Sequence, residues 1–283
     1  MIIYQSGMER CDGKDLRGDG LGVGNRRSYC EPTSAPGVPR YRQRPPRCRC
    51  RGRFGDHRRP RGLHPGRVAS CRGRIDAVVA NAGGGPPQNS LSLNFFGAVA
   101  TLTGLRPLLA NSPAPRAVAV SSIASLRSTP AEIIEKCLQM DELGAIAAAR
   151  TAIERGRLGA GETDRLPDSA QTSLHFYGAA KQALQYWCRR VAPTEEWAGA
   201  GIILNTVTLG FYDTPAAAYV LSNPGLRASI AALAPLRGSF PGRPEEAAAL
   251  LAWCVSPENS QMTGQILFAD GGYEAQLQKD RAA

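Results

Sequence analysis

Short apolar runs alternate with longer stretches of helical spacing along most of this chain. The apolar runs have the length and near-continuous hydrophobic character of strands buried on both faces of a sheet, at residues 75–80, 117–120, 202–206 and 265–268. The intervening stretches have helical spacing or composition, at 91–109, 131–157, 176–192 and 244–254. Strands that alternate with helices predict an α/β fold with a doubly wound parallel sheet.

Polar residues follow three of the predicted strands. Asn81 comes after the first strand, Ser122 after the second, and Thr206 ends the third. Ligands of such sheets bind at the carboxyl ends of the strands. We therefore expect these three side chains to point into one crevice.

The first quarter of the chain differs from the rest. Residues 5–72 repeat Gly, Pro and Arg without a helical or strand period. Residues 1–74 hold 18 of the 34 Lys and Arg and 6 of the 24 Asp and Glu, a balance of +12, whereas the remainder balances at −2. Such a segment cannot bury enough apolar surface to offset its ordering entropy. We expect a basic, disordered segment over 1–72, a folded core over 73–275 and a tail over 276–283.

Cysteine spacing and hydropathy restrict the class of protein further. The early cysteines lack paired C-x-x-C spacing, so free thiols are favoured over a metal site, at positions Cys11, Cys30, Cys48, Cys50 and Cys71. No apolar run reaches the length of a membrane span, and the N-terminus has no apolar signal-peptide core. We expect a cytoplasmic protein without a metal ion or a membrane partner.

The strongest chemical signal is the pair Tyr177 and Lys181. Their spacing of four places both side chains on one face of the predicted helix. A free tyrosine has a pKa of about 10, and a nearby ammonium lowers that value. The pair is therefore predicted to move a proton to or from an alcohol or carbonyl oxygen. By itself this spacing is a weak signal, because two residues on a solvated helix face would look the same.

The order of further landmarks strengthens the interpretation. Tyr177 and Lys181 are flanked by short motifs in a fixed sequence: Asn81-Ala82-Gly83, Asn94, Ser121-Ser122, Asn205, Asp213-Thr214-Pro215 and Asp270-Gly271-Gly272. This ordered set, which covers about 200 residues, resembles the short-chain dehydrogenase/reductase family. The resemblance implies a Rossmann-like sheet.

The resemblance also implies a role for each matching residue. Tyr177 would be the general acid/base, and Lys181 would lower its pKa and bind the nicotinamide ribose. Ser122, rather than Ser121, would hydrogen-bond the substrate oxygen, and Asn94 would hold a water in a proton relay.

Cofactor contacts are implied in the same way. Asn81, Ala82 and Gly83 would line the adenosine side of the cofactor, and Thr214, in the loop that begins at Gly210, would lie near the nicotinamide carboxamide. Two of these residues have simpler structural readings, since Asn81 could cap a turn and Thr214 could cap a helix.

Two departures from the family pattern matter. The family's Pro-Gly after the third strand is replaced by Leu209-Gly210, which is expected to loosen the loop that follows. Ser122 and Tyr177 are also 55 positions apart. The extra segment, about 129–170, resembles the insertion of the bacterial 3α-hydroxysteroid dehydrogenase/carbonyl reductase branch. We expect it to cover the active site or block one subunit contact.

The family's N-terminal βαβ unit, with its Gly-rich phosphate turn, has no counterpart here. The Gly-rich stretch 20–24 has no buried strand before it and no amphipathic helix after it. The Arg, Pro, Gly and Cys excess is typical of a GC-rich gene read out of frame. Codons allowed for residues 37–44, read one nucleotide later, permit Ala-Ser-Arg-Gly-Ile-Gly-Ser-Ala, the family's turn. The same shift over 55–60 permits Val-Ile-Thr-Val-Asp-Leu, a strand ending in a ribose-binding acid.

Loss of that unit has physical consequences whatever its cause. The sheet would lack two strands and expose the edge of a buried parallel sheet. The pyrophosphate cradle and the ribose acid would be missing. We therefore expect weak cofactor binding, marginal stability and a tendency to aggregate.

Several functions remain open at this stage. The first is hydride transfer between NAD or NADP and a secondary alcohol or ketone, and a hydroxysteroid is the first substrate class to test. The out-of-frame reading of residues 55–60 contains a ribose-binding acid, which favours NAD. The others are a degenerate, non-catalytic family member and nucleic-acid binding through the basic arm, which lacks interleaved aromatic residues. The family resemblance also implies a homodimer or homotetramer.

Overall fold

The structure of the protein is a computed structural model that describes residues 2–4, 73–83, 89–155 and 168–279. The predicted disordered segment 5–72 lies outside the described residues. The boundaries of the expected core, insertion and tail therefore stay predictions.

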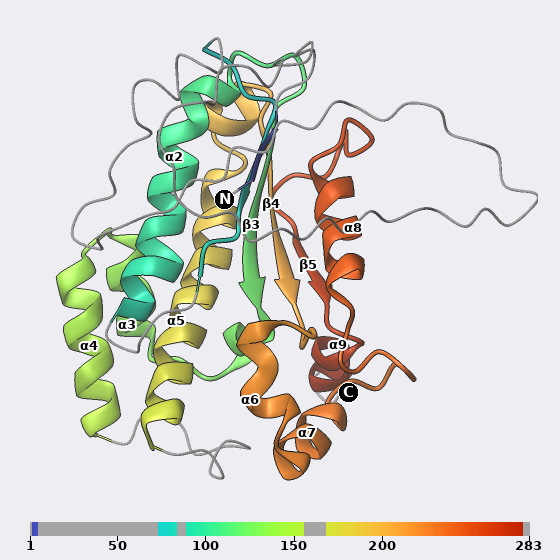
Figure 1. The fold of residues 1–283 in the computed structure, drawn as a ribbon. Coiled ribbons are helices and arrows are strands. Elements are labelled where there is room, and N and C mark those ends of the chain that lie inside the picture. The colour runs from blue at the N-terminus through green and yellow to red at the C-terminus, as the bar shows by residue number, and fades with distance from the viewer. Residues whose placement is uncertain (1, 5–72, 84–88, 156–167, 280–283) are drawn as a thin grey trace, which may run out of the picture.

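A five-stranded sheet in the order β1-β2-β3-β4-β5 forms the centre of the molecule (Figure 1). The strands are β1 (Ile2–Tyr4), β2 (Ala77–Ala80), β3 (Arg116–Ser122), β4 (Ile203–Leu209) and β5 (Ile266–Ala269). Strands β2 to β5 are parallel to one another. Every residue of β2 is buried, as a strand covered on both faces requires. The predicted α/β class and parallel sheet are confirmed.

The edge of the sheet beside β2 differs from the prediction. Strand β1 pairs antiparallel with β2, with Ile2 opposite Val79 and Tyr4 opposite Ala77. This edge is therefore occupied rather than exposed, and the sheet is not wholly parallel. The physical reason is that a buried strand needs partners for its backbone N–H and C=O groups, and a three-residue segment supplies them here.

Helices cover both faces of the sheet (Figure 1). One face is covered by α2 (Gly97–Leu109) and α5 (Asp168–Val191), and the other by α8 (Pro244–Cys254). Helices α3 (Ala131–Leu138) and α4 (Glu142–Glu154) form a further layer outside α5. The larger hydrophobic cluster lies on the α2–α5 side, and a smaller one, around Val118, Val207 and Cys254, lies beneath α8.

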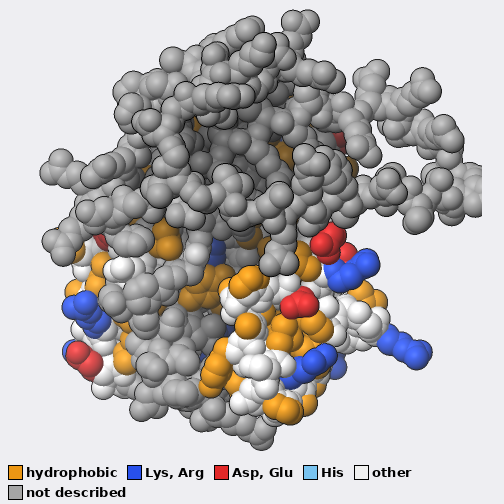
Figure 2. Space-filling model, in the orientation of Figure 1, with side chains coloured by type: hydrophobic (Ala, Val, Ile, Leu, Met, Phe, Trp, Pro, Cys, Tyr) orange, Lys and Arg blue, Asp and Glu red, His pale blue; other side chains and the backbone are white. Residues whose placement is uncertain are grey.

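Shorter elements complete the carboxyl end of the sheet and the connections. These are η2 (Ser92–Phe96), η3 (Ile123–Leu126), η4 (Glu195–Gly199), η5 (Pro215–Ala217), α6 (Ala218–Leu221), α7 (Pro224–Ala231) and α9 (Tyr273–Lys279). Helices α6 and α7 lie beyond the carboxyl ends of the strands (Figure 1). Figure 2 shows hydrophobic side chains gathered over this part of the surface. Tyr219 of α6 and Leu236, which follows α7 in the chain, are 57% and 65% exposed.

The predicted helices are all present within the described residues, but one strand end was placed wrongly. The third predicted strand was expected to finish at Thr206, whereas β4 continues to Leu209. Thr206 is fully buried in the middle of the strand and pairs with Ala119 and Ile266. It does not point into the crevice, because it lies inside the sheet between paired residues of both neighbouring strands.

No helix in the described part of the chain is both long enough and apolar enough to cross a bilayer. The predicted cytoplasmic location stays a prediction. The three later cysteines, Cys137, Cys188 and Cys254, are buried free thiols, in agreement with their apolar sequence context.

Candidate active site

Helix α5 carries both members of the predicted proton-transfer pair. The Lys181 side chain is buried at 3% exposure, and its Nζ donates a hydrogen bond of 2.7 Å to the carbonyl of Val120 in β3. The same Nζ lies 5.5 Å from the centre of the Tyr177 ring. Burial lowers the pKa of Lys181 to about 8. The ammonium is thus held at the carboxyl end of β3, beside the phenol.

The phenol of Tyr177 forms a hydrogen bond with Ser122, the last residue of β3. Burial raises the pKa of Tyr177, and the Ser122 hydrogen bond opposes that rise. The lowered pKa that the Tyr177–Lys181 spacing predicts is therefore wrong for this structure. The reason is that the Lys181 ammonium is directed to the Val120 carbonyl, so burial dominates the environment of the phenol.

The two adjacent serines have different surroundings. Ser121 is buried, and its hydroxyl donates a hydrogen bond of 3.1 Å to the backbone carbonyl of Lys181. Ser122 is only partly buried, and its Oγ also accepts a 3.3 Å hydrogen bond from the amide of Ala124. Successive side chains of a strand point to opposite faces, which separates the two hydroxyls. Only Ser122 meets Tyr177 in the crevice.

Asn94 lies on η2, a π-helical turn that leads into α2. Its side chain is fully buried, and Nδ2 donates a hydrogen bond of 2.8 Å to the carbonyl of Ser90. A Cβ atom added to Gly83 would lie 2.7 Å from Asn94 Oδ1 and 3.6 Å from Lys181 Nζ. The backbone after β2 therefore closely approaches both side chains, and only glycine leaves that space open.

Two residues that the sequence analysis did not assign hold α5 in place. The first is Gly178, next to Tyr177: an added Cβ would lie 2.6 Å from the carbonyl of Ala124 in η3. The second is the buried Gln185, whose Nε2 donates to Ser125 Oγ at 2.9 Å and to Thr208 Oγ1 at 2.8 Å. The only sequence signal for Gln185 is its position one helical turn after Lys181.

The loop that begins at Gly210 is held on several sides. Gly210 lies so close to Asp270 that an added Cβ would be 2.7 Å from its Cα. The Tyr212 hydroxyl donates a 3.0 Å hydrogen bond to the carbonyl of Ala269. The rings of Phe211 and Phe240 stack at 5.5 Å. These tertiary contacts hold the loop in the absence of the family's proline, and the expected loosening after Leu209 stays a prediction.

Thr214 and Asn81 keep surfaces that a ligand could use. Thr214 precedes η5, but its side chain makes no capping hydrogen bond, so the simple cap interpretation does not hold for it. Asn81, Ala82 and Gly83 are all exposed after the end of β2. Their predicted contact with the adenosine side of the cofactor stays a prediction. The phosphate-binding glycine turn is absent from the sequence itself.

A largely apolar pocket of about 790 Å³ lies beside this site. Ile123, the residue after Ser122, forms part of its wall. The stacked pair Phe211 and Phe240 and the side chains of Leu233 and Leu236 contribute apolar surface. The pocket can therefore take a bulky hydrophobic molecule, and Ile123 connects its wall to Ser122 along the chain. No group of three or more His, Cys, Asp or Glu side chains suited to a metal ion occurs among the residues that the structure describes.

A parallel α/β sheet with a tyrosine, a lysine and a serine at its carboxyl edge defines a nucleotide-dependent oxidoreductase fold. Residues 167–274 match a family model described as enoyl-(acyl carrier protein) reductase. The chain is also 32% identical to a 3-alpha-hydroxysteroid dehydrogenase/carbonyl reductase from Comamonas testosteroni, over 74% of this chain and 76% of that protein.

Further comparisons agree. The crystal structure of a 3-alpha-hydroxysteroid dehydrogenase from Pseudomonas sp. B-0831 complexed with NADH superposes with a TM-score of 0.60 and 31% identity, over 75% of this chain and 78% of that one. A 3beta-hydroxysteroid dehydrogenase from Eggerthella lenta is 36% identical, over 35% of this chain and 37% of that protein. The chain belongs to the short-chain dehydrogenase/reductase family, whose members are nicotinamide-dependent oxidoreductases of alcohols and ketones.

Proposed function

We propose that Tyr177 is the general acid/base in the interconversion of a hydrophobic secondary alcohol and its ketone, with Ser122 as the hydrogen-bond donor to the substrate oxygen. The observation that carries the proposal is the hydrogen bond between the Tyr177 phenol and Ser122, the residue before Ile123 in the wall of the apolar pocket. Two donors that meet at one point can polarise a single carbonyl oxygen.

Burial raises the pKa of Tyr177, so the phenol is in the protonated form that ketone reduction requires. A phenol that stays protonated can donate its proton to the ketone oxygen as negative charge develops there. The nicotinamide, when bound, supplies the hydride. The Lys181 ammonium near the ring then stabilises the phenolate that is left, and it binds the nicotinamide ribose. Asn94, next to Gly83 and Lys181, orients a water that returns the proton.

The cofactor is expected to lie along the exposed residues Asn81, Ala82 and Gly83, with Thr214 near the carboxamide. Gly210 shapes this cleft by letting β4 and Asp270 approach each other. We propose NAD rather than NADP. The NADH bound in the Pseudomonas relative supports this choice. The test is the ratio of kcat/KM for NADH and NADPH, and a preference for NADPH would contradict it.

The substrate class follows from the pocket and the relatives. A pocket of about 790 Å³ with aromatic and aliphatic walls suits a rigid polycyclic alcohol better than a short one. The 32% identical relative from Comamonas testosteroni is a hydroxysteroid dehydrogenase/carbonyl reductase. We therefore propose a hydroxysteroid or a compound of similar size as the substrate.

The decisive experiment compares the purified chain with its Tyr177→Phe variant, at millimolar NADH and with a 3-oxosteroid. We expect turnover to fall by about 10²–10⁴-fold, since this is the usual contribution of general acid catalysis. Ser122→Ala should also lose most of its turnover. Tyr186→Phe is the matched control, because Tyr186 lies on the same helix, is 45% exposed and points away from the site.

The two competing functions would give different experimental results. A non-catalytic family member would lose nothing on Tyr177→Phe. A nucleic-acid-binding protein would give a salt-dependent gel shift that survives deletion of the folded core. Either result would replace the enzymatic proposal.

The surroundings of helix α5 bear on the oligomeric state. We propose a homodimer that does not use the outer face of α5, because α3 packs there through Ile133, Ile134 and Cys137. A molar mass measured by light scattering that corresponds to a tetramer would contradict it.

A further inference from the structure

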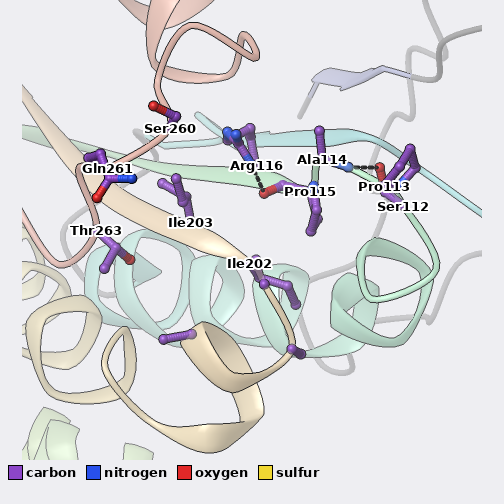
Figure 3. A pocket seen from close by; sticks show the side chains of 13 residues that line it. Ser112, Pro113, Ala114, Pro115, Arg116, Ile202, Ile203, Ser260, Gln261 and Thr263 are labelled. Carbon is purple, nitrogen blue, oxygen red and sulfur yellow. Dashed lines mark hydrogen bonds between the residues drawn. The ribbon is translucent and has the colours of Figure 1, made fainter.

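A second pocket lies at the opposite end of the sheet from Tyr177. It has a volume of about 560 Å³ and is formed where β3 and β4 begin (Figure 3). Its wall combines the turn before β3, the segment before β4 and the loop that follows α8 (Figure 3). The hydride-transfer site at the carboxyl ends of the strands uses none of these segments.

Arg116, the first residue of β3, contributes the charge of this pocket. Its side chain is only 7% exposed, and it pairs in register with Ile203 of β4. Nη1 donates a hydrogen bond of 2.9 Å to the carbonyl of Pro115. The buried Nε has no hydrogen-bond partner, and no described carboxylate forms an ion pair with this guanidinium.

The nearest acid of the neighbouring strand is already engaged. Asp76, whose carbonyl accepts the backbone amide of Arg116, forms an ion pair with Arg74 at 3.3 Å. Its carboxylate also accepts a hydrogen bond of 2.6 Å from Ser112. A buried guanidinium without an acid is costly, because its charge has lost water and gained no anion. Burial lowers the pKa of Arg116, in agreement with this imbalance.

The rest of the pocket supplies neutral polar groups and apolar surface. Ser260 and Gln261 project from the loop after α8, on the other side of the pocket from the turn that leads to Arg116 (Figure 3). Ile202 and Pro113 provide apolar wall. Arg116 supplies a cation, Ser260 and Gln261 supply hydroxyl and amide groups, and no carboxylate occurs among the described residues of the wall. Together they form a site for an anion.

We propose that this pocket binds the oxyanion group of a small ligand, a carboxylate or a phosphate, through the guanidinium of Arg116. A guanidinium presents planar N–H donors that match the oxygens of such a group. The hydroxyl of Ser260 and the amide of Gln261 bind the remaining polar atoms. The site is independent of the proposed oxidoreductase function.

The experiment is calorimetric titration of the full purified chain, without nicotinamide cofactor, at constant ionic strength. Sodium phosphate and sodium succinate are the two probes, and they separate a phosphate from a carboxylate ligand. Binding of one or both to the unaltered chain at millimolar concentration or below is the expected result. If neither binds, the proposal is wrong.

Variants assign the binding to the pocket. Arg116→Gln should weaken binding at least tenfold. Arg150→Gln removes an exposed arginine of α4 and should leave it unchanged. Equal binding by Arg116→Gln would overturn the proposal.

Two further variants guard against misfolding. Arg116→Lys keeps the charge but removes Nε, so it should bind several-fold more weakly. Gln261→Ala alters an exposed side chain and should also weaken binding. Circular dichroism melting checks each fold. If Arg116→Gln fails to fold, unchanged affinity in both of these variants would contradict the site.

Discussion

The side-chain amide of Gln185 donates a hydrogen bond of 2.8 Å to the hydroxyl of Thr208. The same nitrogen donates to Ser125, so one buried group joins α5, η3 and β4. Helix α5 carries the proposed proton donor Tyr177. The turn η3 directly follows Ser122, and β4 leads into the loop that begins at Gly210. Gln185 is therefore a positioning residue for Tyr177, although it lies two turns along the helix from it.

Replacing Gln185 with Leu should lower both stability and turnover. The change leaves the hydroxyls of Ser125 and Thr208 buried without their donor, which costs about 1–3 kcal/mol. Urea unfolding measures the free energy, and steady-state kinetics should show a fall in kcat larger than any change in KM. The triple variant Gln185→Leu/Ser125→Ala/Thr208→Val removes all the polar partners together. It should recover much of the stability but not kcat, whereas recovery of both would show that Gln185 has only a structural role.

Gly178→Ala should separate α5 from η3. Its Cβ would lie 2.6 Å from the Ala124 carbonyl, a backbone atom that cannot turn away. Overpacking of this kind lowers the free energy of unfolding by about 1–3 kcal/mol. The backbone shift that relieves the clash moves Tyr177 relative to Ser122, so we also expect a lower kcat. Gly104→Ala on α2 is the control: nothing lies within 4 Å of the added atom, and helix propensity predicts a gain of about 0.5–1 kcal/mol. Similar effects of the two changes would contradict the close approach at Gly178.

The buried Lys181 should make stability depend on pH in a defined window. Its pKa is about 8 in the folded protein and 10.5 ordinarily, so the unfolded chain binds more protons between these values. The free energy of unfolding therefore rises as the pH increases from about 8 to 10.5. Below pH 8 Lys181 is charged in the folded protein, so the burial of its charge lowers the free energy of unfolding by the full amount. Unfolding of the unaltered chain and Lys181→Met, measured side by side, isolates the effect. The free energy of unfolding of the unaltered chain should increase relative to that of Lys181→Met as the pH rises through this window. A difference that does not change with pH would rule out the lowered pKa.

Cofactor affinity should be poor in this chain. The sequence has no Gly-rich turn to hold the pyrophosphate and no acid placed to bind the adenosine ribose. We expect calorimetric titration with NAD(H) and NADP(H) to show dissociation constants weaker than micromolar, together with marginal stability and a tendency to aggregate. Micromolar binding would contradict the prediction. N-terminal peptide masses that match the printed residues 1–75, with an uninterrupted gene frame, would refute the out-of-frame origin.

Local pattern was sufficient for the elements and for placing Tyr177 and Lys181 on one helix. The apolar runs before Asn81 and Ser122 form buried parallel strands, and the helix with Tyr177 and Lys181 is present. These features depend on residue spacing within one element, which is visible in the sequence. Thr206 shows the limit, because a polar residue inside a buried strand looks like a strand end until the pairing with Ala119 is known.

Taken alone, the sequence determined the α/β fold, the order of the landmarks from Asn81 to Gly272, and the family that they indicate. Only the tertiary structure decided that burial raises the pKa of Tyr177, that Gln185 bridges three elements, and that the buried Arg116 forms no ion pair with a described acid. The physical reason is the distance along the sequence between the residues that make contact. Helix and strand periods repeat over a few residues, whereas Gln185 and Ser125 are 60 positions apart and leave no periodic trace of their contact. The environment of a titratable group is set by such distant neighbours, so it appears only when the chain is folded.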